Sequence, residues 1–184
     1  MVSPVHMHGI MFERCIDFLA SDEQQKRWMP LIQSYNIIGC YAQTEMAHGS
    51  NVQGLETTAT YDIKKKEFVM HTPSILAYKF WPGTLGLHST HAVVFAKVIV
   101  GENNFGVLPF MVPIRSREDH LPFPGVKVGD IGPKLGYESL DNGYLAFNNY
   151  VLPSDSLLKR FIDIDDEGNL ETKGDLRALY AIMV

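Results

Sequence analysis

The chain has 184 residues, enough for one ordinary domain with its own hydrophobic core. With 46% hydrophobic and 20% charged residues, its composition is typical of a soluble globular protein. A net charge of −5 argues against non-specific nucleic-acid binding, and no apolar run is long enough to cross a bilayer. The two cysteines, Cys15 and Cys40, form no CxxC pair, which argues against zinc or dithiol sites and indicates free thiols in a reducing compartment.

Two helices are predicted at the N-terminal end. Residues 5–20 place apolar side chains at helical spacing on one face. Ser21 is followed three residues later by Gln24, a capping-box signature for a second helix that should end near Pro30 or soon after. If these helices are the end of a larger helical domain, the apolar face of the first helix is expected to need partners that are absent from this chain.

From residue 37 to about residue 170 the pattern predicts a mainly β fold. Many short strands separated by turn signals are typical of a sandwich or barrel. The segment 122–137, rich in Gly and Pro, is expected to be an irregular connection. A last helix should begin at about Asp175 and is still apolar where the sequence stops. The expected strands are 37–43, 56–62, 67–71, 76–81, 91–100, 106–113, 143–148 and 161–165.

Common catalytic and metal-binding motifs are missing from the sequence. His88 and His91 lie three residues apart, but no Cys, Asp or Glu near them completes a ligand set, so no metal site is expected. There is no GxSxG nucleophile elbow, no GxxxxGK[ST] phosphate loop and no Rossmann glycine motif. Glu45 and Glu56 each lie at a strand end, where a structural role is expected.

Two segments have residues suited to a flat polar ligand such as a flavin or a nucleotide. In residues 37–62 an apolar strand ends at the polar run QTE, residues 43–45, and a loop with two glycines follows. In residues 79–86 the run WPG, residues 81–83, ends a strand with an aromatic plane and a residue without a side chain. A Trp face can pack on a heteroaromatic ring. Taken alone, each segment is more often a strand end and a turn than a binding site.

The exact amino-acid sequences of these segments resemble those of a known protein family. The runs YAQTEMxHG from residue 41 and GLETTATYD from residue 54 closely resemble the central domain of peroxisomal acyl-coenzyme A oxidases, flavin enzymes related to the acyl-coenzyme A dehydrogenases. The run KFWPGTLG from residue 79 is similar to the family's WPGGLG segment, from which Phe80 and Thr84 depart. Further matching runs extend the resemblance over nearly the whole chain.

The resemblance implies three parts of a larger protein. Residues 1–34 would be the end of an N-terminal helical domain, residues 35–172 a central β-barrel domain that binds FAD and acyl-CoA, and residues 173–184 the start of a C-terminal helical domain. No catalytic residue is assigned, because the family's base, a glutamate, is expected beyond residue 184. On its own, the chain is therefore expected to be inactive.

The implied reaction is the desaturation of fatty acyl-CoA to trans-2-enoyl-CoA in peroxisomal β-oxidation. Its electrons pass through FAD to O2 and give H2O2, and the full-length enzyme is expected to be a homodimer that binds no nucleic acid. Two alternatives remain open: a dehydrogenase that passes electrons to a protein acceptor, and a non-enzymatic acyl-CoA-binding module.

The resemblance also assigns site residues. Thr44 is expected to hydrogen-bond the flavin ring through its hydroxyl and backbone, and Gly83 to lie beside the ring, where its missing side chain would leave room for oxygen. Ser50 would also lie near the pantetheine end of the substrate, although Ala47 and Ser50 differ from the family's usual residues there. Tyr137 is expected to border the acyl pocket. The residues expected to contact FAD are Tyr41, Gln43, Thr44, Ser50, Trp81 and Gly83.

Overall fold

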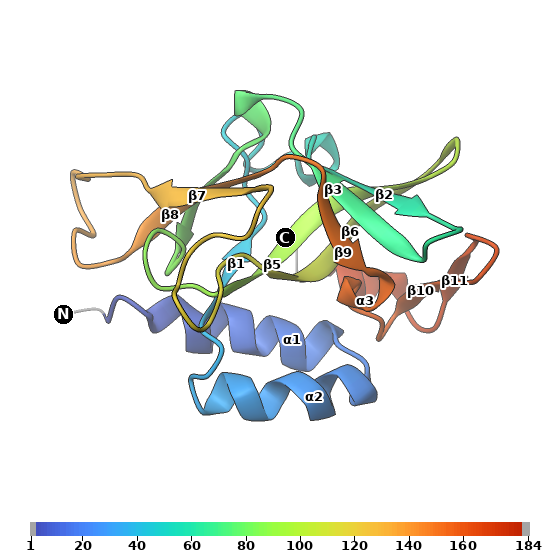
Figure 1. Ribbon diagram of the computed structural model, residues 1–184, viewed down its shortest axis with the longest axis horizontal. Coiled ribbons are helices and arrows are strands. Elements are labelled where there is room, and N and C mark those ends of the chain that lie inside the picture. Colours follow the sequence, from blue (N-terminus) through green and yellow to red (C-terminus); the bar gives the residue numbers. More distant parts are fainter. Residues whose placement is uncertain (1–2, 182–184) are drawn as a thin grey trace.

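The computed structural model describes residues 3–181 and confirms a mainly β fold with two helices at the N-terminal end. Figure 1 shows these two helices lying along one side of the strands. None of the helices within residues 3–181 combines the length and the apolar character needed to span a membrane. The strands therefore form the body of the domain, and the helices cover one side of it.

The N-terminal segment is helical in two adjoining stretches, a π-helical η1 (His8–Glu13) and an α-helical α1 (Arg14–Leu19). The predicted capping box then begins α2 (Asp22–Gln33): Gln24 N donates to Ser21 Oγ at 3.3 Å, and Ser21 N donates to Gln24 Oε1 at 3.0 Å. Both predicted helices are confirmed. Pro30 lies inside α2, which runs one turn further to Gln33.

The strands form two main sheets and one hairpin. Strand β5 pairs in parallel first with β1 and then with β2 along one edge, and with β6 on the other edge. The first sheet contains, in this order, β1 (Gly39–Ala42), β5 (His91–Val100), β2 (Thr58–Asp62), β3 (Glu67–His71) and β9 (Tyr150–Pro153), with β6 (Asn103–Pro113) paired to β5. The second sheet contains, in this order, β4 (Lys79–Gly83), β8 (Asn142–Phe147) and β7 (Val126–Asp130). The hairpin consists of β10 (Ile162–Ile164) and β11 (Leu170–Thr172).

The core is centred on β5. Residues 92–96 are all buried, and because consecutive residues of a strand point to opposite faces, both faces of β5 are covered. The N-terminal helices cover part of this core, and Phe12 packs directly on Gly39 at the start of β1. The expectation that this helix face needs partners absent from the chain was therefore wrong, because the strands of the chain bury it. Its buried residues are His8, Phe12, Cys15, Ile16 and Leu19.

Several sequence predictions of local structure were wrong. Strand β7 lies within 122–137, where no regular structure was expected, and β9 and β11 were not predicted at all. The expected strand 76–81 begins only at Lys79, because residues 75–77 form a 3-10 turn. In β7, Val126 pairs with Phe147 and Val128 with Leu145, so pairing with β8 outweighs the Gly and Pro content of the segment.

The last helix begins near the predicted point, as α3 (Leu176–Ala181). Residues 182–184 of the predicted helix lie outside the described part of the chain.

Candidate functional site

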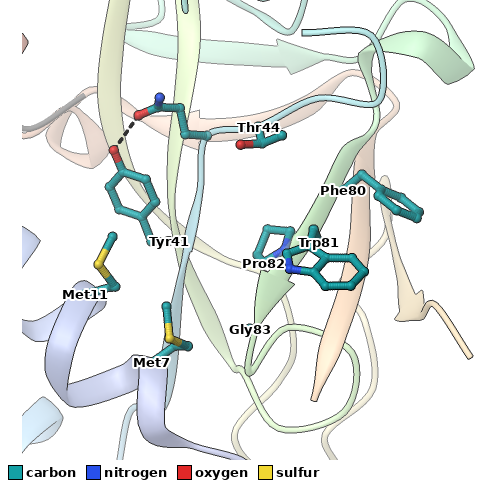
Figure 2. A pocket seen from close by; sticks show the side chains of 9 residues that line it. Met7, Met11, Tyr41, Thr44, Phe80, Trp81, Pro82 and Gly83 are labelled. Atoms are coloured by element: carbon teal, nitrogen blue, oxygen red, sulfur yellow. Dashed lines mark hydrogen bonds between the residues drawn. The ribbon is translucent and has the colours of Figure 1, made fainter. Parts of the chain in front are cut away.

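A cavity of about 280 Å3 lies between the N-terminal helix, the end of β1 and strand β4 (Figure 2). It gathers three segments that are far apart in the sequence. Most of its wall is apolar or aromatic, with a few polar groups at the end of β1, a composition suited to a flat organic ligand. The lining residues are Met7, Met11, Tyr41, Gln43, Thr44, Phe80, Trp81, Pro82 and Gly83.

The polar groups of the cavity come from β1 and the residues after it. The Tyr41 hydroxyl donates a hydrogen bond to Gln43 Oε1, drawn as a dashed line in Figure 2. Burial raises the pKa of Tyr41, so its hydroxyl keeps its proton at neutral pH. Thr44 is exposed, and its carbonyl accepts from Phe80 N at 3.0 Å. The Thr44 N–H and hydroxyl have no partner among residues 3–181, so both remain available to a ligand.

Strand β4 supplies the opposite wall through an irregular stretch. Its register with β8 shifts between Phe80 and Gly83, and Trp81 has a φ of +82°, which is unusual for a residue with a side chain. Asn142 Nδ2 holds this backbone by donating to the Trp81 carbonyl at 2.6 Å. Trp81 is left 49% exposed at the cavity. A strained backbone that is held by its surroundings is typical of functional sites.

A buried ion pair ties the two walls together. Lys79 Nζ lies 3.0 Å from Glu45 Oε1, and both side chains are fully buried. Burial alone would raise the pKa of Glu45, but the Lys79 charge and the hydrogen bonds from Glu56 and Thr57 outweigh it and lower that pKa. Burial lowers the pKa of Lys79 to about 8, against the attraction of Glu45, which still leaves the ammonium protonated at neutral pH. Both members of the pair are therefore charged.

Gly83 lies against a residue that the sequence did not single out. A Cβ placed on Gly83 would lie 2.5 Å from Met7 Cγ, so the two residues cannot both keep their places if position 83 carries a side chain. The room that was expected beside Gly83 is thus filled by Met7 in this structure. Figure 2 shows Met7 and Met11 rising from the helix toward the cavity.

The structure brings together most of the residues expected to contact the cofactor. Five of them line the cavity: Tyr41, Gln43, Thr44, Trp81 and Gly83. Ser50 and Tyr137 do not line it. Ser50 is exposed in the loop before β2, and Tyr137 is 71% exposed in the loop between β7 and β8, so their roles stay predictions.

Four lining residues were missed: Met7, Met11, Phe80 and Pro82. Met7 and Met11 are four residues apart, a spacing that places them on one helix face, but nothing in the sequence tells which surface that face meets. The histidines that were considered for metal binding have other partners. His88 Nδ1 lies 2.7 Å from Asp141 Oδ2, and no group of three possible ligands is found in the part of the chain that is described.

Glu45 is excluded as a base by its bonding. Its carboxylate accepts from Glu56 N at 2.7 Å, from Thr57 N at 3.0 Å and from Thr57 Oγ1 at 2.7 Å, besides Lys79. A carboxylate with four partners and a lowered pKa is poorly suited to accept a proton. The cavity can therefore hold and orient a flat ligand, but no described residue in it is placed to abstract a proton.

Comparison with known proteins gives the same family along the whole chain. The family model "Acyl-CoA dehydrogenase, middle domain" matches residues 40–150, and "Acyl-coenzyme A oxidase N-terminal" matches residues 2–38. The acyl-coenzyme A oxidase acox-1.1 of Caenorhabditis elegans is 48% identical over 99% of this chain, and peroxisomal acyl-coenzyme A oxidase 1 of Arabidopsis thaliana is 52% identical over 89%. The chain spans only 27% and 25% of these relatives.

Solved structures agree with this. Arabidopsis thaliana acyl-CoA oxidase 1 superposes with a TM-score of 0.94 at 48% identity, over 98% of this chain and 28% of that one. Acyl-CoA oxidase-2 of Caenorhabditis elegans, solved with FAD, ascaroside-CoA and ATP, gives a TM-score of 0.94 at 44% identity, over 98% and 27%.

Proposed function

Because the chain belongs to the acyl-CoA dehydrogenase and oxidase family, we propose that it forms the flavin-facing part of a peroxisomal acyl-CoA oxidase. The reaction removes a proton from the α carbon and a hydride from the β carbon of a fatty acyl-CoA, which gives trans-2-enoyl-CoA. The two electrons pass to O2, which takes up two protons and becomes H2O2. FAD, when bound, accepts the hydride.

One observation carries the proposal. A single cavity collects five residues, from two segments about 40 positions apart, to which the family resemblance assigns FAD contacts. Their chemistry fits a flavin edge. Trp81 offers a half-exposed aromatic plane, Thr44 offers a hydroxyl and an N–H that have no partner among residues 3–181, and Gly83 adds a wall position without a side chain.

In this proposal the residues of the chain bind and orient. Thr44 donates hydrogen bonds to the polar edge of the ring, and Trp81 packs against its plane. The Tyr41 hydroxyl is already bonded to Gln43, which fixes the orientation of the amide at the cavity wall. The base is contributed by residues other than those described, since Glu45 is held in its ion pair.

The division into parts remains a proposal of the same kind. Residues 1–34, 35–172 and 173–184 would contribute to an N-terminal helical, a central and a C-terminal helical domain, and the working enzyme would be a homodimer. Peroxisomal localisation follows the names of relatives such as Arabidopsis peroxisomal acyl-coenzyme A oxidase 1. A dehydrogenase that uses a protein acceptor is the second candidate, because one matching family model covers dehydrogenases.

The test is peroxide release by the full-length gene product, purified with FAD, in air and with a long-chain acyl-CoA. Peroxide formed in equal amount to enoyl-CoA is the expected result. Flavin reduction without peroxide would instead support the dehydrogenase, and no reduction would refute both. Thr44→Ala should lower the affinity for FAD, whereas the matched change Thr60→Ala, at an exposed position of β2, should not.

A further inference from the structure

Met7 occupies the space that a side chain at position 83 would need. The three heavy atoms nearest to an added Cβ at Gly83 would be Met7 Cγ at 2.5 Å, Met7 Cβ at 3.4 Å and Leu140 Cδ2 at 3.4 Å. Met7 is thus the main occupant of the recess beside Gly83. In Figure 2 its thioether rises into the cavity opposite Pro82 and Trp81.

The backbone that carries Met7 cannot retreat easily. The next residue, His8, is buried and joins two elements: Gly39 N donates to His8 Nδ1 at 3.0 Å, and His8 Nε2 donates to the Ile32 carbonyl at 3.2 Å. Phe12, one turn later, is fully buried against Gly39. These contacts fasten the helix to β1 and α2, so the Met7 side chain must itself move if Met7 is to leave the recess.

Methionine is able to make such a move. Its side chain is unbranched, with three rotatable bonds and no polar group that needs a partner, so it can repack around ligands of different shape. Met7 is only partly buried, whereas its neighbour His8 is 1% exposed. A fixed helix therefore presents an adaptable side chain at the point where Gly83 opens the wall.

We propose that Met7 is a specificity-determining residue that discriminates against acyl groups branched at the α carbon. The inference rests on the proposed function, in which Gly83 lies beside the flavin. The α and β carbons must lie next to the flavin to react, so they lie next to Gly83 and Met7. A straight chain leaves Met7 in the recess. A methyl substituent on the α carbon adds volume at this point and must displace Met7.

The test compares octanoyl-CoA with 2-methyloctanoyl-CoA as substrates of the full-length, FAD-containing gene product. One additional methyl group in a tight apolar pocket changes kcat/KM by roughly 10-fold to 200-fold. Met7→Ala should lower the ratio of kcat/KM for the straight over the branched substrate by about 10-fold or more. Met7→Leu, which conserves volume, should keep the ratio near that of the wild type.

Met11→Ala is the matched control. Met11 lines the same cavity from the same helix, but it is not among the closest neighbours of a Cβ at Gly83. Its loss enlarges the cavity elsewhere and should leave the straight-to-branched ratio near the wild-type value. An equal fall of the ratio in Met7→Ala and Met11→Ala, or no fall in either, would overturn the proposal.

Binding provides a readout that does not depend on turnover. S-octyl-CoA and S-(2-methyloctyl)-CoA are thioethers without the carbonyl that acidifies the α carbon, so they bind without reacting. Their ratio of Kd values, from calorimetric titration, should move in Met7→Ala in the same direction as the kinetic ratio. If the wild type binds both analogues but does not oxidise octanoyl-CoA, the proposed function fails, while the Kd ratio still decides the role of Met7.

Discussion

Replacing Lys79 with methionine should destabilise the domain strongly, although the side chain is apolar and of similar length. The Lys79 ammonium donates to the Gln43 carbonyl at 3.0 Å, to Glu45 Oε1 at 3.0 Å and to the Phe95 carbonyl at 2.7 Å. Lys79→Met leaves two buried carbonyls without these donors and a buried carboxylate without its cation. The three donors that Glu45 retains from Glu56 and Thr57 offset only part of this loss.

The size of the expected loss of stability follows from these contacts. Removing one member of a buried ion pair costs about 3–5 kcal/mol. For a domain of this length each kcal/mol lowers the melting temperature by about 2–4 °C, so the shift should be roughly 6–20 °C. Circular dichroism during heating and urea denaturation followed by tryptophan fluorescence measure it in two independent ways.

A surface ion pair supplies the control. Lys66 Nζ lies 2.6 Å from Asp166 Oδ1, but both side chains are more than half exposed, so Lys66→Met should change stability little. The double variant Glu45→Gln with Lys79→Met should be more stable than the sum of the two single changes predicts, because it leaves no unpaired buried charge. If Lys79→Met lowers the free energy of unfolding no more than Lys66→Met does, the prediction that the buried pair stabilises the domain strongly is refuted.

Two further results are expected from the buried groups. Burial lowers the pKa of His8 below its ordinary 6.5, so the unfolded chain binds this proton more readily and stability is lost as pH falls through about 6.5. His8→Gln should flatten that part of a plot of unfolding free energy against pH. An unchanged slope would contradict this expectation. Burial also raises the pKa of Cys15 and Cys40 to about 12. Both thiols should therefore stay unreactive toward a disulfide reagent at pH 8 until the chain is unfolded in urea. Rapid labelling of the native protein would contradict their burial.

Local patterns were sufficient to predict most of the elements. The capping box at Ser21 and Gln24 satisfies donors at the start of α2 whatever lies around it, and the long apolar run of β5 is readable because both faces are buried. Local patterns did not predict strand β7. Its segment reads as a loop because of glycine and proline, and it is a strand because β8 lies beside it. Partners of this kind are set by tertiary structure.

Local sequence patterns also predicted only part of the site. The polar residues at the end of β1 and the WPG run of β4 were assigned to the site because their exact letters resemble a known family, since composition alone favoured an ordinary strand end and turn. Met7 and Met11 were not, since methionines on a helix face are normally core residues. Their place at the cavity depends on how the helix docks on β1 through His8 and Phe12. Both side chains contact Gly39, which is 31 residues after His8 in the sequence.

The position of the buried ion pair has a structural cause in the way β5 changes partners. Residues 91–94 of β5 pair with β1, and residues 97–99 pair with β2, so Phe95 lies in the gap between the two neighbours. A buried carbonyl in that gap needs a donor, and the Lys79 ammonium supplies it. A charge brought so deep needs a counter-charge, which Glu45 provides at the end of β1. The pair also joins this end to β4, through the bridge between residues 45 and 79. The cavity thus forms where two sheets meet, and the residues that fill the gap in β5 also fix Thr44 and Trp81 on opposite walls.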